Sequence, residues 1–269
     1  MSKRAPCRMD NITFDIHSKY RESASLKNFV ENISQRFENE GEVIFSGSRN
    51  VIKTFCIDTE DEVLNNVVVK KFRARNIFQQ LAYSSFWASK AKRAYNNGLR
   101  LTEMDANSTP YPIAFAETRR CGLLTQCYYA TVFTEAPSVR EQLEKKPFNV
   151  SLATSFARFI AKLHDNGIVH HDLNFSNVLY SEEDGEYRIS VIDINRMTTD
   201  AALSIEDCKD DFVRWTDDMK LYEHVMREYA RARHLDEERF IKHAFALKRQ
   251  HDKAWKRRKT FTHRLKKLF

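Results

Sequence analysis

Apolar residues follow two different spacings along this chain of 269 residues. Between residues 41 and 133, short runs of β-branched and aromatic residues are bounded by turn residues, a pattern typical of strands. After residue 150, apolar residues recur every three or four positions, as on one face of an amphipathic helix. The pattern predicts that strands dominate the first half of the chain and helices the second.

The same spacings assign individual segments. Strands are expected within residues 41–69, at 111–116 and at 122–133, and helices at about 26–37 and 78–101. Apart from the first of these helices, residues 1–40 are polar and mixed. The second half should hold a helix at 151–165, a β-hairpin from Val178 to Ile192, and helices beginning near Asp211 and Asp236. Asp236 precedes two glutamates, an order that suits the start of a helix.

The residues with the clearest chemistry lie in the run LHDNGIVHHDLNFSNVLY and in the strand that follows it. Asp172 and Asn177 are five positions apart, and Asp193 ends the next apolar run. Phosphoryl transfer from ATP needs a carboxylate that takes the proton of the acceptor hydroxyl. It also needs an amide and a second carboxylate that hold Mg²⁺ on the phosphates. The three residues stand in the order of the kinase motifs H-R-D, Asn and D-F-G.

Three histidines in this run, His164, His170 and His171, raise the alternative of a zinc site. Structural zinc requires four converging ligands, and no other Cys or His pair in the chain has suitable spacing. We therefore interpret His170 as a packed anchor of the loop.

The run around Asp172 resembles the catalytic loop of the protein-kinase-like superfamily. It is most similar to that of the bacterial lipopolysaccharide kinases, which phosphorylate Kdo or heptose of the inner core, and the similarity extends from about residue 41 to about 230. The resemblance implies an α+β, two-lobed fold with ATP bound between the lobes. A small β-rich N-lobe would span residues 1–135 and a helical C-lobe residues 136–269.

The resemblance also assigns roles to particular residues. Asp172 would be the base, and Asn177 and Asp193 the Mg²⁺ ligands. Lys70, at the end of Val67-Val68-Val69-Lys70, would contact the ATP phosphates, and Gly47 would lie in the loop that covers them. Lys70 could instead be a surface lysine, with Lys71 on the opposite face of the strand as the fallback. The segment around Gly47 could be an ordinary hairpin.

Some positions depart from the kinase pattern. No Asp or Glu occurs between Lys70 and Glu103, whereas kinases place a Glu near the position of Asn96 to pair with the lysine. Asn96 could hydrogen bond to Lys70 instead, or another carboxylate could hold it. Asn174 replaces a lysine of protein kinases, which makes Arg196 a candidate for neutralising transition-state charge. The A-P-E motif is missing, which favours a small-molecule or glycolipid acceptor over a protein.

Composition limits the cellular setting and the partners. The net charge is +7, and five cysteines form no C-x-x-C pair. The N-terminus lacks an apolar signal region and no apolar run is long enough to span a membrane. These features favour a cytoplasmic protein with reduced thiols. Residues 248–269 carry ten Lys or Arg against one Asp. This tail is consistent with an anionic membrane surface, with a structural helix of the C-lobe or, less favoured, with nucleic acid.

We therefore expect an ATP- and Mg²⁺-dependent kinase that phosphorylates a sugar hydroxyl, of Kdo or heptose, in the lipopolysaccharide core glycolipid. It would be cytoplasmic, with a peripheral position on the inner face of the cytoplasmic membrane as an option. Two alternatives stay open: a kinase of another small molecule or of protein, and a pseudokinase-like nucleotide-binding scaffold. The sequence predicts no oligomeric state.

Overall fold

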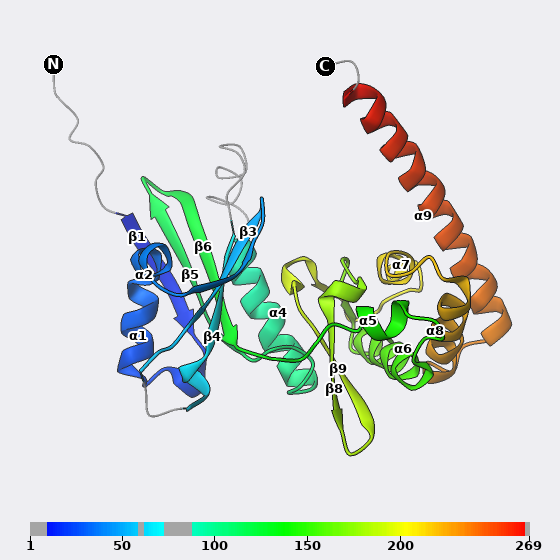
Figure 1. The fold of residues 1–269 in the computed structure, drawn as a ribbon, viewed down its shortest axis with the longest axis horizontal. Coiled ribbons are helices and arrows are strands. Elements are labelled where there is room, and N and C mark those ends of the chain that lie inside the picture. Colours follow the sequence, from blue (N-terminus) through cyan, green and yellow to red (C-terminus); the bar gives the residue numbers. More distant parts are fainter. Residues whose placement is uncertain (1–9, 59–61, 73–87, 267–269) are drawn as a thin grey trace. The chain divides into compact units, whose positions relative to one another are not determined.

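The computed structural model describes residues 10–58, 62–72 and 88–266, and the chain divides into two compact units, Met1–Glu135 and Ala136–Phe269 (Figure 1). The first unit is built on one antiparallel sheet and the second is mainly helical. The roles expected for the two units, nucleotide covering and catalysis, stay predictions.

The first unit contains a six-stranded sheet in the order β1-β5-β6-β4-β3-β2. All neighbours pair antiparallel, and β4 and β6 form the centre. The hairpin between β5 and β6 turns at Cys121 and Gly122, which both have positive φ. The strands are β1 (Asp10–Ile16), β2 (Glu42–Ser46), β3 (Asn50–Phe55), β4 (Val67–Phe72), β5 (Pro112–Arg120) and β6 (Leu123–Val132).

Strand β1 was not expected from the sequence, because the segment was judged polar. Ile12, Phe14 and Ile16 nevertheless alternate with polar residues, which is the period-two signal of a strand. It pairs with β5, from Asp10 opposite Arg120 to Ile16 opposite Ala114, and forms one edge of the sheet.

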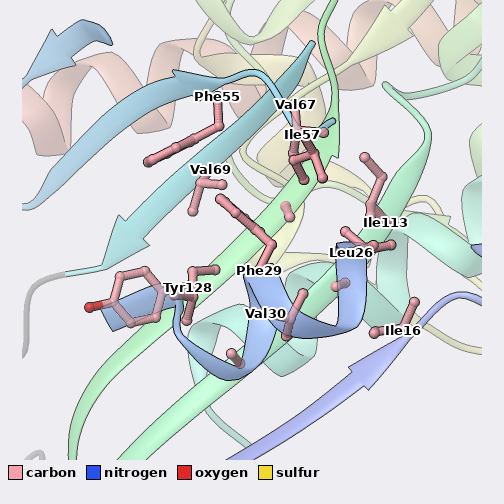
Figure 2. Close-up of a cluster of buried hydrophobic side chains, with 14 of the residues drawn as sticks. Ile16, Leu26, Phe29, Val30, Phe55, Ile57, Val67, Val69, Ile113 and Tyr128 are labelled. Atoms are coloured by element: carbon pink, nitrogen blue, oxygen red, sulfur yellow. The ribbon is translucent and has the colours of Figure 1, made fainter. Parts of the chain in front are cut away.

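Two short helices, α1 (Ala24–Glu31) and α2 (Ile33–Asn39), cover one face of the sheet (Figure 2). The single helix expected at 26–37 is therefore interrupted at Asn32, which ends α1 and begins α2. Phe29, fully buried, packs against Phe55 with ring centroids 5.1 Å apart. Burial of an aromatic or aliphatic side chain of this size contributes about 1.5–3 kcal/mol. The core also includes Leu26, Val30, Ile33, Phe37, Val67, Val69, Ile113 and Tyr128.

Helix α4 (Lys90–Met104) packs on β5 and β6. Ser89 caps its start by accepting the N–H of Lys92 at 3.1 Å. Gly98 allows the close approach, because a Cβ there would lie 2.7 Å from the Oη atom of Tyr129. The helix expected at 78–101 is thus present from residue 90, whereas residues 78–87 lie outside the described residues. Its buried positions are Ala91, Ala94, Tyr95, Gly98 and Leu101.

The second unit surrounds helix α6 (Val150–Asp165), which coincides with the helix expected at 151–165. Phe156, Phe175, Trp215 and Tyr222 are buried and stack or meet edge to face at centroid distances of 5.2–5.9 Å. The expected hairpin is formed by β8 (Val178–Glu183) and β9 (Glu186–Val191), and β7 (Ile168–Val169) pairs with β10 (Thr198–Thr199). The remaining helices are α5 (Arg140–Glu144), α7 (Lys209–Val213), α8 (Met219–Ala232) and α9 (Glu237–Lys266).

Helix α9 has a packed first part and an exposed second part. Asp236 accepts the N–H of Arg239 at 2.9 Å and so caps the helix start, as the sequence predicted. Phe240, Ile241 and Ala244 are buried, and Lys248 is 3% exposed. Residues 253–260 are all exposed, and the helix extends away from the other helices of its unit (Figure 1). No described helix is both long enough and apolar enough to traverse a bilayer.

Candidate active site

The loop that carries Asp172 begins at a glycine that no other residue could replace without a shift. Helix α6 ends at Asp165, and Gly167 follows with φ +72°. A Cβ on Gly167 would lie 2.0 Å from the carbonyl oxygen of Asp200. The chain therefore reverses here against the segment that follows Asp193, and the N–H of Asp200 donates to the Gly167 carbonyl at 2.8 Å.

A buried carboxylate, that of Asp211, anchors the backbone of the loop. Oδ2 of Asp211 accepts the backbone N–H of His170 at 2.7 Å, and Oδ1 accepts that of His171 at 2.8 Å. Asp211 lies in α7 and is fully buried. Burial alone would raise the pKa of this carboxyl, but the hydrogen bond and charge of His164 and the contacts with His170 lower it. The carboxylate is thus kept ionised and both loop amides are satisfied.

A chain of hydrogen bonds through His164, Tyr229 and Arg233 holds Asp211. His164 Nε2 lies 3.3 Å from Oδ2 of Asp211, and its Nδ1 lies 2.8 Å from Tyr229 Oη. Arg233 donates to the same Oη at 2.7 Å and to Asp165 Oδ1 at 2.7 Å. With a proton on Nε2, the imidazole donates to the Asp211 carboxylate. The network fixes the helix that carries His164 to the helix that carries Tyr229.

His170 joins the loop to the strand that leads to Asp193. Its side chain is buried; Nε2 lies 3.1 Å from the carbonyl oxygen of Ile192, and Nδ1 accepts the N–H of Asp172 at 3.3 Å. Burial lowers the pKa of His170, so the neutral ring predominates near neutral pH. This is the packed anchor that the sequence predicted, and both of its ring nitrogens are used by protein atoms.

His171 occupies a left-handed backbone conformation with φ 63°. Its Nδ1 lies 3.2 Å from Asp210 Oδ2, and its Nε2 lies 2.7 Å from Thr198 Oγ1. Non-glycine residues rarely adopt this conformation outside sites where the surroundings impose it. The two contacts and the Asp211 carboxylate impose it here, and the turn carries the chain into Asp172.

The structure brings Asp172, Asn177 and Asp193 together in the second unit. The Nδ2 of Asn177 donates to the Asp172 carbonyl at 2.9 Å. The hairpin pairs Val178 with Val191, and the N–H of Ile192 donates to the Asn177 carbonyl at 2.9 Å. Asn177, which precedes β8, and Asp193, which lies two positions after β9, are therefore held near each other.

The donor atoms of Asn177 and Asp193 fit a hard cation. With its Nδ2 given to Asp172, the Asn177 side chain offers its amide oxygen. Asp193 adopts a left-handed conformation with φ 61°, and its Oδ1 accepts from Asn195 Nδ2 at 2.7 Å, which orients the carboxylate. Mg²⁺ is commonly bound by one or two protein oxygens together with substrate phosphates and water. These two residues would hold it.

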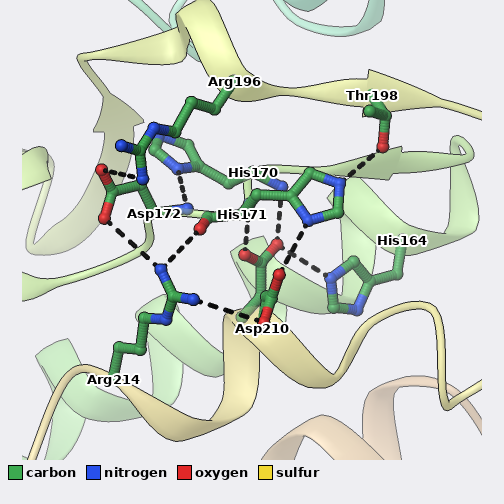
Figure 3. Close-up of polar contacts among 9 residues, drawn as sticks. His164, His170, His171, Asp172, Arg196, Thr198, Asp210 and Arg214 are labelled. Atoms are coloured by element: carbon green, nitrogen blue, oxygen red, sulfur yellow. Dashed lines mark hydrogen bonds and ion pairs between the residues drawn. The ribbon is translucent and has the colours of Figure 1, made fainter. Parts of the chain in front are cut away.

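Two arginines contact the Asp172 carboxylate. Arg196 Nη1 lies 3.3 Å from Oδ2, and Arg214 Nη1 lies 3.9 Å from Oδ1 (Figure 3). Arg214 also donates to the His171 carbonyl at 3.1 Å and pairs with Asp210 at 3.5 Å. The sequence pointed to Arg196 but missed Arg214 and Asp211. Both residues lie far from Asp172 in the sequence, so no local pattern indicates their roles. The sequence shows only that Asp211 directly precedes the apolar pair Phe212-Val213.

The nucleotide-binding candidates Lys70 and Gly47 lie in the first unit. Lys70 is paired with Tyr129, whose hydroxyl faces α4, so Lys70 lies on the α4 face of the sheet. Lys71 lies on the opposite face, where it contacts Glu38 and the ring of Phe37, so the fallback residue is committed elsewhere. Gly47 lies in the turn between β2 and β3, and its N–H donates to the backbone carbonyl of Asn50 at 3.0 Å.

The contact suggested between Asn96 and Lys70 is not formed. Asn96 is exposed on α4, because the buried face of that helix is made by Ala94, Tyr95 and Gly98. An amide at this position therefore does not replace the missing glutamate. The Nζ atom of Lys70 lies 5.2 Å from the ring centroid of Phe72.

Comparison with known proteins yields one family and several relatives. The sequence model of the lipopolysaccharide kinase (Kdo/WaaP) family matches residues 55–215. A 3-deoxy-D-manno-octulosonic acid kinase of Vibrio cholerae is 29% identical over 136 residues, 48% of this chain and 55% of that protein. A protein of the same name from Haemophilus influenzae is 24% identical over 173 residues, 62% of this chain and 72% of that protein. The match thus spans about half the length of the Vibrio relative.

A solved structure described as WaaP in complex with acyl carrier protein resembles the chain with a TM-score of 0.59. The likeness covers 88% of this chain and 98% of that one at 15% sequence identity. At this identity it shows the fold alone, and it confirms the protein-kinase-like fold expected from the sequence.

The contacts of Asp211 predict a large effect of Asp211→Asn. An amide offers an N–H to at least one of the loop N–H donors, so a buried donor loses its charged acceptor. We expect a loss of about 3 kcal/mol in the free energy of unfolding, measured by urea denaturation. Asp210→Asn is the matched control, because its half-exposed carboxylate contacts only side chains and should cost less than about 1 kcal/mol. Equal losses for the two variants would show that Asp211 does not anchor the loop.

Proposed function

This chain belongs to the lipopolysaccharide kinase (Kdo/WaaP) family, and from that premise we propose that it transfers the γ-phosphoryl group of ATP to a sugar hydroxyl of the lipopolysaccharide inner core. Membership confirms the resemblance and the kinase class expected from the sequence. We further propose 3-deoxy-D-manno-octulosonic acid (Kdo), rather than heptose, as the acceptor sugar. The names of the Vibrio and Haemophilus relatives support this choice.

The observation that carries the proposal is that hydrogen bonds link the chain segments that carry Asp172, Asn177 and Asp193. Asn177 Nδ2 donates to the backbone carbonyl of Asp172, and the hairpin ties Asn177 to the strand that leads to Asp193. In this arrangement the Asp172 carboxylate would serve the acceptor while the other two groups serve a cation. The same three roles are those that phosphoryl transfer requires.

Asp172 would orient the acceptor hydroxyl and take its proton. The hydroxyl oxygen forms a bond to the γ-phosphorus as the bond to the bridging oxygen of ADP breaks, and ADP leaves. Mg²⁺, when held by Asn177 and Asp193, neutralises charge on the phosphates. The loop contributes position, since Asp211 and His170 fix the backbone from His170 to Asp172.

Lys70 and Gly47 are proposed as the ATP contacts of the first unit. Lys70 lies on the α4 face of the central strand β4, and its stem follows an apolar strand, which suits a lysine that reaches phosphates. Gly47 stands in a turn of small residues whose N–H groups can approach an anion. The absence of a glutamate near Asn96 favours the alternative of a nucleotide-binding scaffold without turnover.

We propose that the enzyme works at the cytoplasmic face of the membrane, where its exposed basic helix would dock on anionic lipid. The first turns of α9 are structural, because Lys248 is buried between Asp217 and Asp252 at 3.7 and 3.3 Å. Beyond them, Lys256, Arg257 and Lys259 are exposed beside Trp255, which is 53% exposed. Basic residues near anionic lipid gain about 1 kcal/mol each, and tryptophan suits the lipid–water boundary.

The role of Asp172 predicts that Asp172→Asn keeps ATP binding but lowers turnover by roughly two or more orders of magnitude, the scale of general-base loss. The assay follows phosphate transfer from ATP with Mg²⁺, with and without extracted core glycolipid. Asp184→Asn, in the exposed turn of the β8–β9 hairpin, is a control that should turn over like wild type.

Turnover of Asp172→Asn close to that of wild type would remove the assignment. A wild-type protein that binds ATP but transfers no phosphate to any acceptor would favour the scaffold instead.

The exposed part of α9 predicts binding to vesicles that contain anionic lipid and no binding to zwitterionic vesicles, with loss at high salt. Changing Lys256, Arg257, Arg258 and Lys259 to Glu should weaken sedimentation with anionic vesicles. The same charge change at the exposed residues Lys27, Lys145, Lys209 and Lys220 is the control. If the α9 variant sediments as wild type does, these four residues do not mediate docking. If it unfolds, the helix end is structural.

A further inference from the structure

The guanidinium of Arg196 contacts one oxygen of the Asp172 carboxylate, the group proposed as the general base. Its Nη1 is 3.3 Å from Oδ2, and Arg214 lies 3.9 Å from Oδ1. Both oxygens of the carboxylate are therefore engaged by cations. An acceptor hydroxyl can reach Asp172 only if one of the two arginines gives way or shares its oxygen.

The two arginines differ in how firmly they are held. Arg214 has two further contacts, the His171 carbonyl at 3.1 Å and Asp210 at 3.5 Å, and its side chain is 35% exposed. Arg196 is paired with Asp172, its side chain is 50% exposed, and it stands on the short helix Ile194–Arg196 directly after Asp193. Arg196 is thus the one able to turn from Asp172 to a ligand.

We propose that Arg196 is an acceptor-binding residue that recognises an anionic group beside the hydroxyl to be phosphorylated. This rests on the proposed function. The anionic group is the carboxylate of the acidic sugar or a phosphate attached near it. Arginine binds either anion through two parallel N–H donors, with a geometry that a lysine does not match.

In this proposal Arg196 exchanges Asp172 for the acceptor anion, so Asp172 can take a proton only when the acceptor is bound. Without acceptor, Arg196 compensates the charge of Asp172. When an anionic acceptor binds, the guanidinium moves to the acceptor anion and Oδ2 is released for the hydroxyl proton. A neutral sugar offers no competing anion, so Arg196 stays on Asp172 and the sugar is rejected. Arg196 thereby acts in specificity as well as affinity.

The alternative role for Arg196 is neutralisation of charge on the transferred phosphoryl group. The two roles make different predictions. A phosphate-facing arginine affects turnover with every acceptor equally, whereas an acceptor-facing arginine affects only those acceptors that carry the anion. A double-mutant cycle between protein and acceptor separates them.

The experiment measures kcat and KM for wild type, Arg196→Gln and Arg196→Lys on three probes. The first is deacylated lipid A that carries one Kdo residue, the second is its Kdo methyl ester, and the third is the same molecule without phosphates. On the first probe we expect Arg196→Gln to raise KM about tenfold or more, the scale of one charge-assisted hydrogen bond. Arg196→Lys should recover part of this loss, and KM for ATP should not change.

The decisive result is the dependence on the probe. If the penalty of Arg196→Gln vanishes on the methyl ester, the anion is the carboxylate; if it vanishes on the phosphate-free probe, the anion is a phosphate. A penalty of equal size on all three probes overturns the proposal. Arg188→Gln is the control, because Arg188 pairs with Glu183 on the exposed β8–β9 hairpin and should leave every value unchanged.

Failure of the proposed function looks different. In that case wild type phosphorylates none of the probes, and calorimetry in the presence of a non-hydrolysable ATP analogue detects no binding of the first probe. The inference about Arg196 then falls with it. Thermal melting of each variant shows that a loss does not come from unfolding.

Discussion

The second unit depends on one buried carboxylate. Asp211 accepts the backbone N–H groups of two consecutive loop residues, His170 and His171, and it is held in turn by His164. A buried charge is costly unless it is fully hydrogen bonded, and the same cost makes a satisfied charge a strong constraint on the groups around it. Because both donors belong to the backbone, the constraint fixes the path of the loop independently of the side chains that the loop carries.

The geometry of the candidate site follows from that constraint. With His170 fixed, its ring links Asp172 to Ile192, so the loop and the strand before Asp193 are held in register. The hairpin and the bond from the Ile192 N–H to the Asn177 carbonyl then hold Asn177 beside the residue that precedes Asp193. Arg214 binds both the loop backbone and the Asp172 side chain, and Arg196, with the more exposed side chain of the two, contacts the Asp172 carboxylate. A carboxylate on a fixed loop beside a less restrained arginine is the arrangement that the proposed acceptor-dependent reaction would need.

Local pattern was enough to predict much of the fold. Helix α6, the β8–β9 hairpin and the Asp236 cap follow from spacing and turn residues alone. Strand β1 was not predicted, because its segment is mostly polar and only the alternation of Ile12, Phe14 and Ile16 marks it as a strand. Asp211 and Arg214 could not be assigned roles, since about forty residues separate them from the loop that they hold. A contact over that distance leaves no periodic signal, and an aspartate at the start of a helix is commonly a cap. The roles of Asp172, Asn177, Asp193, Lys70 and Gly47 stay predictions.

Hydrogen exchange at the backbone amides of His170 and His171 tests the central role of Asp211 most directly. Each N–H is donated to a buried carboxylate, so exchange should require opening of the packed helices rather than a local motion of the loop. The account predicts that both amides exchange as slowly as the core amides of helix α6 in wild type. In Asp211→Asn they should exchange much faster than those core amides. Rapid exchange of both amides in the wild-type protein would contradict it.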